Sequence, residues 1–145
     1  MATLADVVDI GGLDGYLAVV STLRSDATIQ SSVVNAGVLV HPLDGGEVVG
    51  FVTYGRAKLA NLRVRPQLSV TFGAGWRWVT VEGRAALFGP HDGPADLDTE
   101  VLRLLLRTVF TAAGGTHDDW AAYDRTMAEQ GRTAVLVAPS RIYSN

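Results

Sequence analysis

Apolar and polar positions alternate along most of this chain with the two-residue period of β-strands. These runs are rich in valine, leucine and threonine, and short turns that contain glycine, proline or aspartate separate them. Because consecutive short strands joined by tight turns favour an antiparallel barrel over a doubly wound sheet, we expect a mainly-β fold. The runs cover residues 16–23, 28–40, 48–53, 67–73, 76–88 and 133–138.

Four further segments predict helices, which begin near residues 3, 56, 96 and 116 and end near residues 12, 65, 110 and 131. Thr3 with Asp6, and Thr116 with Asp119, have the spacing of capping boxes. The glycines after the first and last of these segments are natural helix ends. In the last helix Trp120, Tyr123 and Met127 form a stripe that we expect to pack against the sheet. Residues 139–145 are expected to form a tail.

Composition and charge indicate one globular domain over residues 1–145. The chain is 48% hydrophobic and 19% charged, and its net charge of −3 argues against nucleic acid as the main partner. The absence of cysteine excludes disulfides, thiol catalysis and cysteine metal sites. The amino-terminal residues do not resemble a signal peptide, and no apolar run reaches the length of a membrane span. We therefore expect a cytoplasmic protein without a membrane anchor.

The most informative segment for function is the strand at residues 48–53 and the helix that follows it. Arg56 and Lys58, the chain's one lysine, fall in the first turn of this helix. Cations are disfavoured at this end of the helix dipole, whereas free amides make it a ready anion site. The residues alone leave two interpretations equally open, a solvated basic turn and a phosphate site.

The strand at residues 76–88 carries an unusual pair of aromatic residues. Trp76 and Trp78 share their face with Thr80, Glu82 and Arg84, whereas the apolar residues lie on the other face. Aromatic residues with a polar group are enriched at interfaces and at the walls of sites. We therefore expect this pair to cover a cofactor or a partner chain.

Motifs for protein-based catalysis are absent. The chain has no GxGxxG after a strand, no P-loop, no GxSxG elbow and no HExxH, and its three histidines do not have metal-ligand spacing. No catalytic residue and no metal site are predicted. An anion site beside an aromatic wall, with no nucleophile or base, suits a protein whose chemistry is supplied by a bound cofactor.

Four segments carry a family resemblance that covers nearly the whole chain. They are Gln30-Ser-Ser-Val-Val34, Thr53-x-x-Arg-Ala-Lys-x-x-Asn-Leu-Arg63, Gly75-Trp-x-Trp-x-x-x-Glu-Gly83 and His117-x-Asp-Trp-x-x-Tyr123. The sequence resembles the flavin/deazaflavin oxidoreductase superfamily, the split β-barrel relatives of pyridoxamine 5′-phosphate oxidase. Within it, the chain is most similar to the mycobacterial-type branch that uses the deazaflavin coenzyme F420.

This resemblance implies a six-stranded antiparallel split β-barrel of Greek-key topology, the FMN-binding split barrel, with a few flanking helices. It implies a homodimer with a cofactor site at the interface. Arg56 and Lys58 would then bind the cofactor phosphate, with the Ala57 amide nearby and Asn61 in support. The ring system would lie against Gln30, Ser32, Val33, Val34, Val52 and Thr53, and Trp76 and Trp78 would come from the partner subunit.

The implied function is an F420-dependent oxidoreductase that transfers a hydride from the reduced deazaflavin to an unsaturated small organic substrate. A rival hypothesis keeps the fold and uses FMN in an oxidase or reductase. F420 has an acidic glutamyl tail, so Arg63 or Arg24 near the cleft would favour F420. Two more hypotheses are a non-catalytic F420 or flavin carrier and a structural dimer with a vestigial site. Tyr54 is a possible proton donor, but we favour a role as a structural cap on the barrel.

Overall fold

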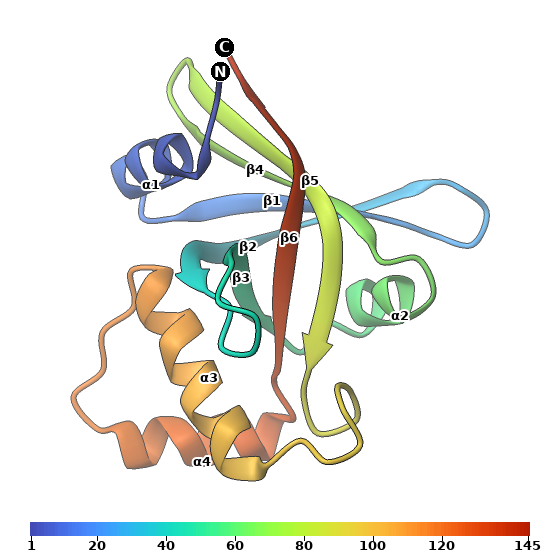
Figure 1. The fold of residues 1–145 in the computed structure, drawn as a ribbon, viewed down its shortest axis with the longest axis vertical. Coiled ribbons are helices and arrows are strands. Elements are labelled where there is room, and N and C mark those ends of the chain that lie inside the picture. Colours follow the sequence, from blue (N-terminus) through green and yellow to red (C-terminus); the bar gives the residue numbers. More distant parts are fainter.

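Six strands form a closed antiparallel barrel in this computed structural model, which describes residues 1–145. Their order around the barrel is β1-β2-β3-β6-β5-β4, and every neighbouring pair is antiparallel. The predicted six-stranded antiparallel barrel is therefore confirmed (Figure 1). The strands are β1 (Leu17–Leu23), β2 (Ile29–Val40), β3 (Glu47–Thr53), β4 (Gln67–Ala74), β5 (Arg77–Phe88) and β6 (Thr133–Ser144).

The last strand is longer than its apolar run predicts. The expected tail over residues 139–145 is wrong, because β6 continues through Pro139 to Ser144 along β5. A proline cannot donate to a sheet, so it is tolerated where the ladder is irregular. Pro139 pairs with Gly83 at the register shift between Glu82 and Gly83, and the strand is therefore not broken.

Four helices flank the barrel: α1 (Leu4–Leu13), α2 (Arg56–Val64), α3 (Thr99–Ala112) and α4 (Trp120–Gln130). The expected glycine end of α1 is wrong, because Gly11 lies inside the helix, where a Cβ would come within 3.3 Å of the rings of Phe72 and Tyr16. The expected start of α4 is also too early. Asp119 is the N-cap itself and accepts a hydrogen bond of 3.0 Å from the amide of Ala122.

The hydrophobic residues form two cores. The first fills the barrel and includes Val7 and Ile10 of α1 and Leu59 and Leu62 of α2. The second lies between the barrel and α3, around Val109. The two helices α3 and α4 lie together at one end of the molecule, while both termini and the β4–β5 turn lie at the other (Figure 1). None of the helices is both long and apolar enough to span a bilayer.

The aromatic stripe of α4 packs on α3 within the second core, which also contains residues of the sheet, among them Leu39 and Leu136. The rings of Trp120 and Tyr123 lie 6.1 and 4.9 Å from the ring of Phe110. The buried hydroxyl of Tyr123 donates a hydrogen bond of 2.9 Å to the carbonyl of Leu106. Burial raises the pKa of Tyr123 to about 12, so this hydroxyl stays protonated and fixes α4 to α3.

The helix α3 in turn approaches β2 backbone to backbone. A Cβ on Gly37 would lie 2.1 Å from the carbonyl oxygen of Ala112, which is far inside van der Waals contact. Only glycine therefore permits this approach. The pair of helices is positioned against β2 and β3, and this placement creates the cavity described next.

Candidate functional site

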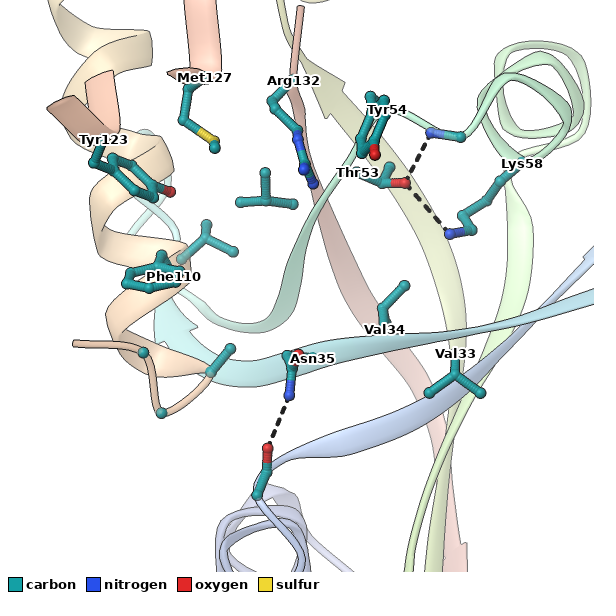
Figure 2. Close-up of a pocket in the computed structure, with 17 residues that line it drawn as sticks. Val33, Val34, Asn35, Thr53, Tyr54, Lys58, Phe110, Tyr123, Met127 and Arg132 are labelled. Atoms are coloured by element: carbon teal, nitrogen blue, oxygen red, sulfur yellow. Dashed lines mark hydrogen bonds between the residues drawn. The ribbon is translucent and has the colours of Figure 1, made fainter. Parts of the chain in front are cut away.

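A cavity of about 620 Å³ lies between the barrel wall and the α3–α4 pair (Figure 2). Strands β2 and β3 form one side of it, and the start of α2 forms one end. Helices α3 and α4 form the other side together with Arg132, which lies two residues after the end of α4. Its lining includes two cations, Lys58 and Arg132, and no carboxylate. An uncompensated positive charge in a partly apolar cavity favours an anionic ligand.

Lys58 lies at the α2 end of the cavity and is 6% exposed. Its ammonium group donates a hydrogen bond of 3.3 Å to Thr53 Oγ1 and lies 5.7 Å from the centre of the Phe51 ring. No carboxylate lies within salt-bridge distance of it, and desolvation lowers the pKa of Lys58. A buried ammonium without a counter-ion is costly, and a bound anion would offset that cost.

The same end of the cavity presents free backbone amides. The N-cap of α2 is Gly55, which has no side chain to cap the helix. The first helical amide with a backbone acceptor is that of Leu59, which donates to the Gly55 carbonyl at 3.1 Å. The amides of Arg56 and Ala57 precede it; both residues are exposed and lie beside the cavity lining formed by Gly55 and Lys58, without being part of it. The predicted start of this helix after Gly55 is confirmed, and the burial of Lys58 argues against a merely solvated basic turn.

The floor of the cavity is apolar. Val34, Val52 and Thr53 come from β2 and β3, and Val33 lies beside them. In Figure 2 Val34 points from β2 toward the centre of the cavity, whereas Val33 points to the other side of the strand. Val33 is 65% exposed, so the cavity opens at this edge of the barrel.

Three other polar residues implied by the resemblance do not line this cavity. Asn61 is buried and donates a hydrogen bond of 3.0 Å to Thr22 Oγ1, which in turn donates to Gln30 Oε1 at 3.0 Å. This chain of bonds joins α2 to β1 and β2. Ser32 has a buried hydroxyl oxygen without a hydrogen-bond partner in the protein. The structure therefore gives Asn61 and Gln30 a role in positioning α2.

The tryptophan pair is also outside this chain's cavity. Trp76 is in the β4–β5 turn, at the end of the barrel away from α3 and α4 (Figure 1), and is 92% exposed. Trp78 packs edge-on against Tyr143, with 6.1 Å between ring centroids. The hydroxyl of Tyr143 donates to Glu82 Oε2 at 2.6 Å. That these tryptophans reach a partner's site stays a prediction.

None of the site residues predicted from the sequence lies in the cavity wall opposite the barrel. It consists of side chains from α3 and α4, among them Phe110, Tyr123 and Met127. Two residues of the α4 stripe, Tyr123 and Met127, belong to this wall, although their helical spacing in the sequence indicates only packing. Arg132 follows the left-handed cap residue Gly131, with its φ of 60°, and no local pattern indicates its role.

Tyr54 lies at the rim of this cavity. It is 55% exposed, and the Arg132 guanidinium carbon lies 3.9 Å from the centre of its ring.

Neither of the arginines considered for an acidic cofactor tail lines the cavity. Arg63 forms two hydrogen bonds of 2.8 Å with Asp92, whose pKa is lowered by them. Arg24 donates to the Ile29 carbonyl at 2.9 Å.

Comparison with known proteins gives a match to one family model and several solved structures of the same fold. Residues 14–144 match the family model described as pyridoxamine 5′-phosphate oxidase. No curated protein matches the sequence significantly. Among solved structures, the chain is similar to the conserved hypothetical protein Rv2991 from Mycobacterium tuberculosis, with 19% identity and a TM-score of 0.69. That similarity covers 99% of this chain and 84% of that chain.

Two further solved structures carry names that mention a cofactor. One is an F420 reductase, with 17% identity, a TM-score of 0.58 and coverage of 92% of this chain and 94% of that chain. The other is a pyridoxamine 5′-phosphate oxidase-related, FMN-binding protein from Nostoc punctiforme. It has 13% identity, a TM-score of 0.60 and coverage of 99% of this chain and 86% of that chain. At these identities the structures support the fold alone.

Proposed function

Because the chain belongs to the pyridoxamine 5′-phosphate oxidase family, we propose that it is an oxidoreductase that uses coenzyme F420. When bound, reduced F420 supplies a hydride to an unsaturated small organic substrate. The observation that carries this proposal is Lys58, a buried ammonium without a counter-ion at the start of α2, facing an apolar cavity. The resemblance of the sequence to the F420-using branch supports the choice of cofactor.

The residues in the first turn of α2, of which Lys58 lines the cavity and Arg56 and Ala57 do not, fit a cofactor phosphate. Lys58 offers an ammonium group, Arg56 offers an exposed guanidinium, and the amides of Arg56 and Ala57 offer further donors. Thr53 holds the Lys58 ammonium in place through its hydroxyl oxygen, which also accepts from the Gly55 amide at 3.1 Å. Anions bound in this way gain both charge-assisted hydrogen bonds and the helix dipole.

The floor of the cavity fits a flat ring system. Val34 and Val52 present apolar surface beside Thr53, and Val33 extends it toward the open edge. These side chains would orient the ring and exclude water from one of its faces, which favours a reactive geometry with the substrate. No side chain in the cavity is assigned as a catalytic acid.

We also propose that two copies associate through the outer face of β1 and β2. Val19 and Val33 are directly opposed across these strands, are 43% and 65% exposed, and lie next to the exposed side chain of Leu17. A contiguous apolar face of this kind marks an interaction site more often than a free surface. Since Val33 also lines the open edge of the cavity, a second copy here would help to close it.

FMN is the second candidate cofactor, and one observation favours it. Arg63 and Arg24 are engaged elsewhere, so this chain supplies no basic groove of its own for the glutamyl tail of F420. FMN requires phosphate capture without such a groove.

A fluorescence titration of the purified protein with F420 and, in parallel, with FMN tests the proposal. We expect micromolar binding of F420 and much weaker binding of FMN. Replacing both Arg56 and Lys58 with alanine should cost about 2–4 kcal/mol of binding free energy, because two charged phosphate contacts are lost. Arg125→Ala, an exposed arginine on α4 outside the cavity, is the matched control.

The outcomes of this titration separate the competing functions. Preference for FMN would move the protein to the flavin-dependent side of the family. Tight F420 binding without oxidation of reduced F420 across a broad panel of unsaturated substrates would indicate a carrier. Binding of neither cofactor, or binding that the double variant does not change, would contradict the proposed site.

A further inference from the structure

We propose that Arg132 binds the carboxylate of this protein's substrate, which is therefore a small carboxylic acid with a flat apolar body. That this acid is the substrate rests on the proposed function, whereas its binding to Arg132 does not. The inference follows from the position of Arg132, from its unused donors and from the chemistry of the wall beside it.

The guanidinium of Arg132 is held on two sides. It stacks over the ring of Tyr54, with 3.9 Å between the guanidinium carbon and the ring centroid. Its Nε donates a hydrogen bond of 2.8 Å to Gln130 Oε1. In Figure 2 the side chain lies between Met127 and Tyr54 and points into the cavity. Such a group is already ordered before a ligand arrives, so binding costs little side-chain entropy.

The two terminal nitrogens of Arg132 have no acceptor in the protein, and no carboxylate pairs with them. Three other arginines are paired with carboxylates. Arg103 and Arg107 share Asp124, and Arg63 pairs with Asp92. A planar guanidinium with both terminal nitrogens free matches the geometry of a carboxylate. Arg132 is therefore suited to bind such a group in the cavity.

The anion bound by Arg132 differs from the one proposed for Lys58. Thr53 and Tyr54 lie between these two side chains in Figure 2, with Lys58 on the α2 side and Arg132 on the α4 side. Lys58 sits in the first turn of α2, whose free amides suit a phosphate, whereas Arg132 lies beyond the end of α4. The cavity thus offers two separate sites for negative charge.

The wall beside Arg132 is apolar and largely aromatic. The rings of Phe110 and Tyr123 have centroids 4.9 Å apart, and Met127 lies on the same side of the cavity. Aromatic rings and a thioether favour contact with a flat apolar group. A ligand with a carboxylate at Arg132 would place its apolar body against this wall, over the floor formed by Val52 and Val34.

Binding of trans-cinnamate and of its neutral amide to the purified protein tests the inference, with calorimetry as the readout and no cofactor present. We expect saturable binding of cinnamate and at least about tenfold weaker binding of cinnamamide, because a charge-assisted bidentate pair is lost. Arg132→Gln should bind both compounds equally weakly, and Arg132→Lys should retain part of the preference. Arg125→Gln is the matched control and should behave as the unchanged protein.

Failure of this inference is distinct from failure of the proposed function. Absence of cinnamate binding, equal binding of cinnamate and cinnamamide, or unchanged cinnamate binding by Arg132→Gln would overturn it. If Arg132→Gln weakens F420 binding but not cinnamate binding, Arg132 holds a cofactor carboxylate, and the inference is also overturned. Selective cinnamate binding by a protein that binds neither F420 nor FMN would support the carboxylate site and contradict the proposed cofactor.

Discussion

The ammonium of Lys58 lies 3.3 Å from the hydroxyl oxygen of Thr53, its one hydrogen-bond partner in the protein. Desolvation lowers the pKa of Lys58, which means that the folded protein disfavours its charged form. The unfolded chain then binds protons more readily than the folded one, so this group reduces stability at neutral pH, and the reduction disappears as pH rises.

Lys58→Met should therefore stabilise the cofactor-free protein while it removes cofactor binding. We expect about 1 kcal/mol of added stability in urea unfolding at pH 7, with the difference from the unchanged protein shrinking toward pH 10. Cofactor affinity should fall at least about tenfold through loss of a charged contact. A less stable variant, or one that binds the cofactor normally, would contradict this account of Lys58.

Asn61→Leu should reduce stability and leave cofactor affinity unchanged. The side-chain amide of Asn61 faces Thr22 in the buried chain of hydrogen bonds between α2 and the barrel. We expect a loss of about 1 kcal/mol in chemical unfolding and the same dissociation constant in the fluorescence titration. The matched variant Arg56→Gln should keep its stability and bind the cofactor more weakly. Weak binding by a fully stable Asn61→Leu protein would place this amide in the phosphate site.

Val19→Asp should dissociate the proposed homodimer. A carboxylate on the outer face of β1 would be buried without a partner when two copies meet there. Sedimentation velocity should show the unchanged protein as a dimer and the variant as a monomer. Val101→Asp is the control, because Val101 is exposed to a similar degree, 41% against 43%, and lies on α3. A monomeric unchanged protein would refute the interface.

Asp124→Asn should loosen the attachment of α4 to α3. Asp124 accepts hydrogen bonds from Arg107 and Arg103, which lower its pKa to about 2. Since this value lies below that of the unfolded chain, the stabilisation is complete above about pH 4 and is lost as pH falls toward 2. We expect the variant to lose about 1 kcal/mol at pH 7, an amount reduced by solvent screening.

The pH dependence provides the control for Asp124. The difference between Asp124→Asn and the unchanged protein should shrink in unfolding experiments as pH falls below about 4, and it should be small at about pH 2, where the carboxyl group of the folded protein is about half protonated. Asp96→Asn, a change at an exposed carboxylate, should have little effect at either pH. A constant difference across this pH range would exclude the ion pairs as its source.

The barrel and the position of α2 could be predicted from the sequence because their signals are local. Alternation marks the strands, and Gly55 and Pro66 bracket α2. The predicted start of α4 is too early because Thr116 and Asp119 have capping-box spacing, although Asp119 itself caps the helix. The extension of β6 escapes prediction because Pro139 is tolerated only through a register shift in β5, which has no local sequence signal.

The α4 side of the cavity could not be predicted, because it depends on contacts between distant segments. Arg132 acquires its orientation from Tyr54, the residue after β3, and from the turn at Gly131. Neither segment alone indicates a binding site. The burial of Lys58 is likewise a property of the assembled fold, since its place in the first turn of a helix is compatible with full exposure.

The contact between Gly37 and the Ala112 carbonyl has a consequence for how this site could diverge among relatives. Because backbone meets backbone there, α3 can move no closer to β2, and a larger residue in place of Gly37 would push the helix away. Backbone contact therefore fixes the spacing of α3 and β2 as long as residue 37 is glycine. New ligand sizes and charges would have to arise by substitution of side chains elsewhere in the cavity lining, such as Met127 and Arg132.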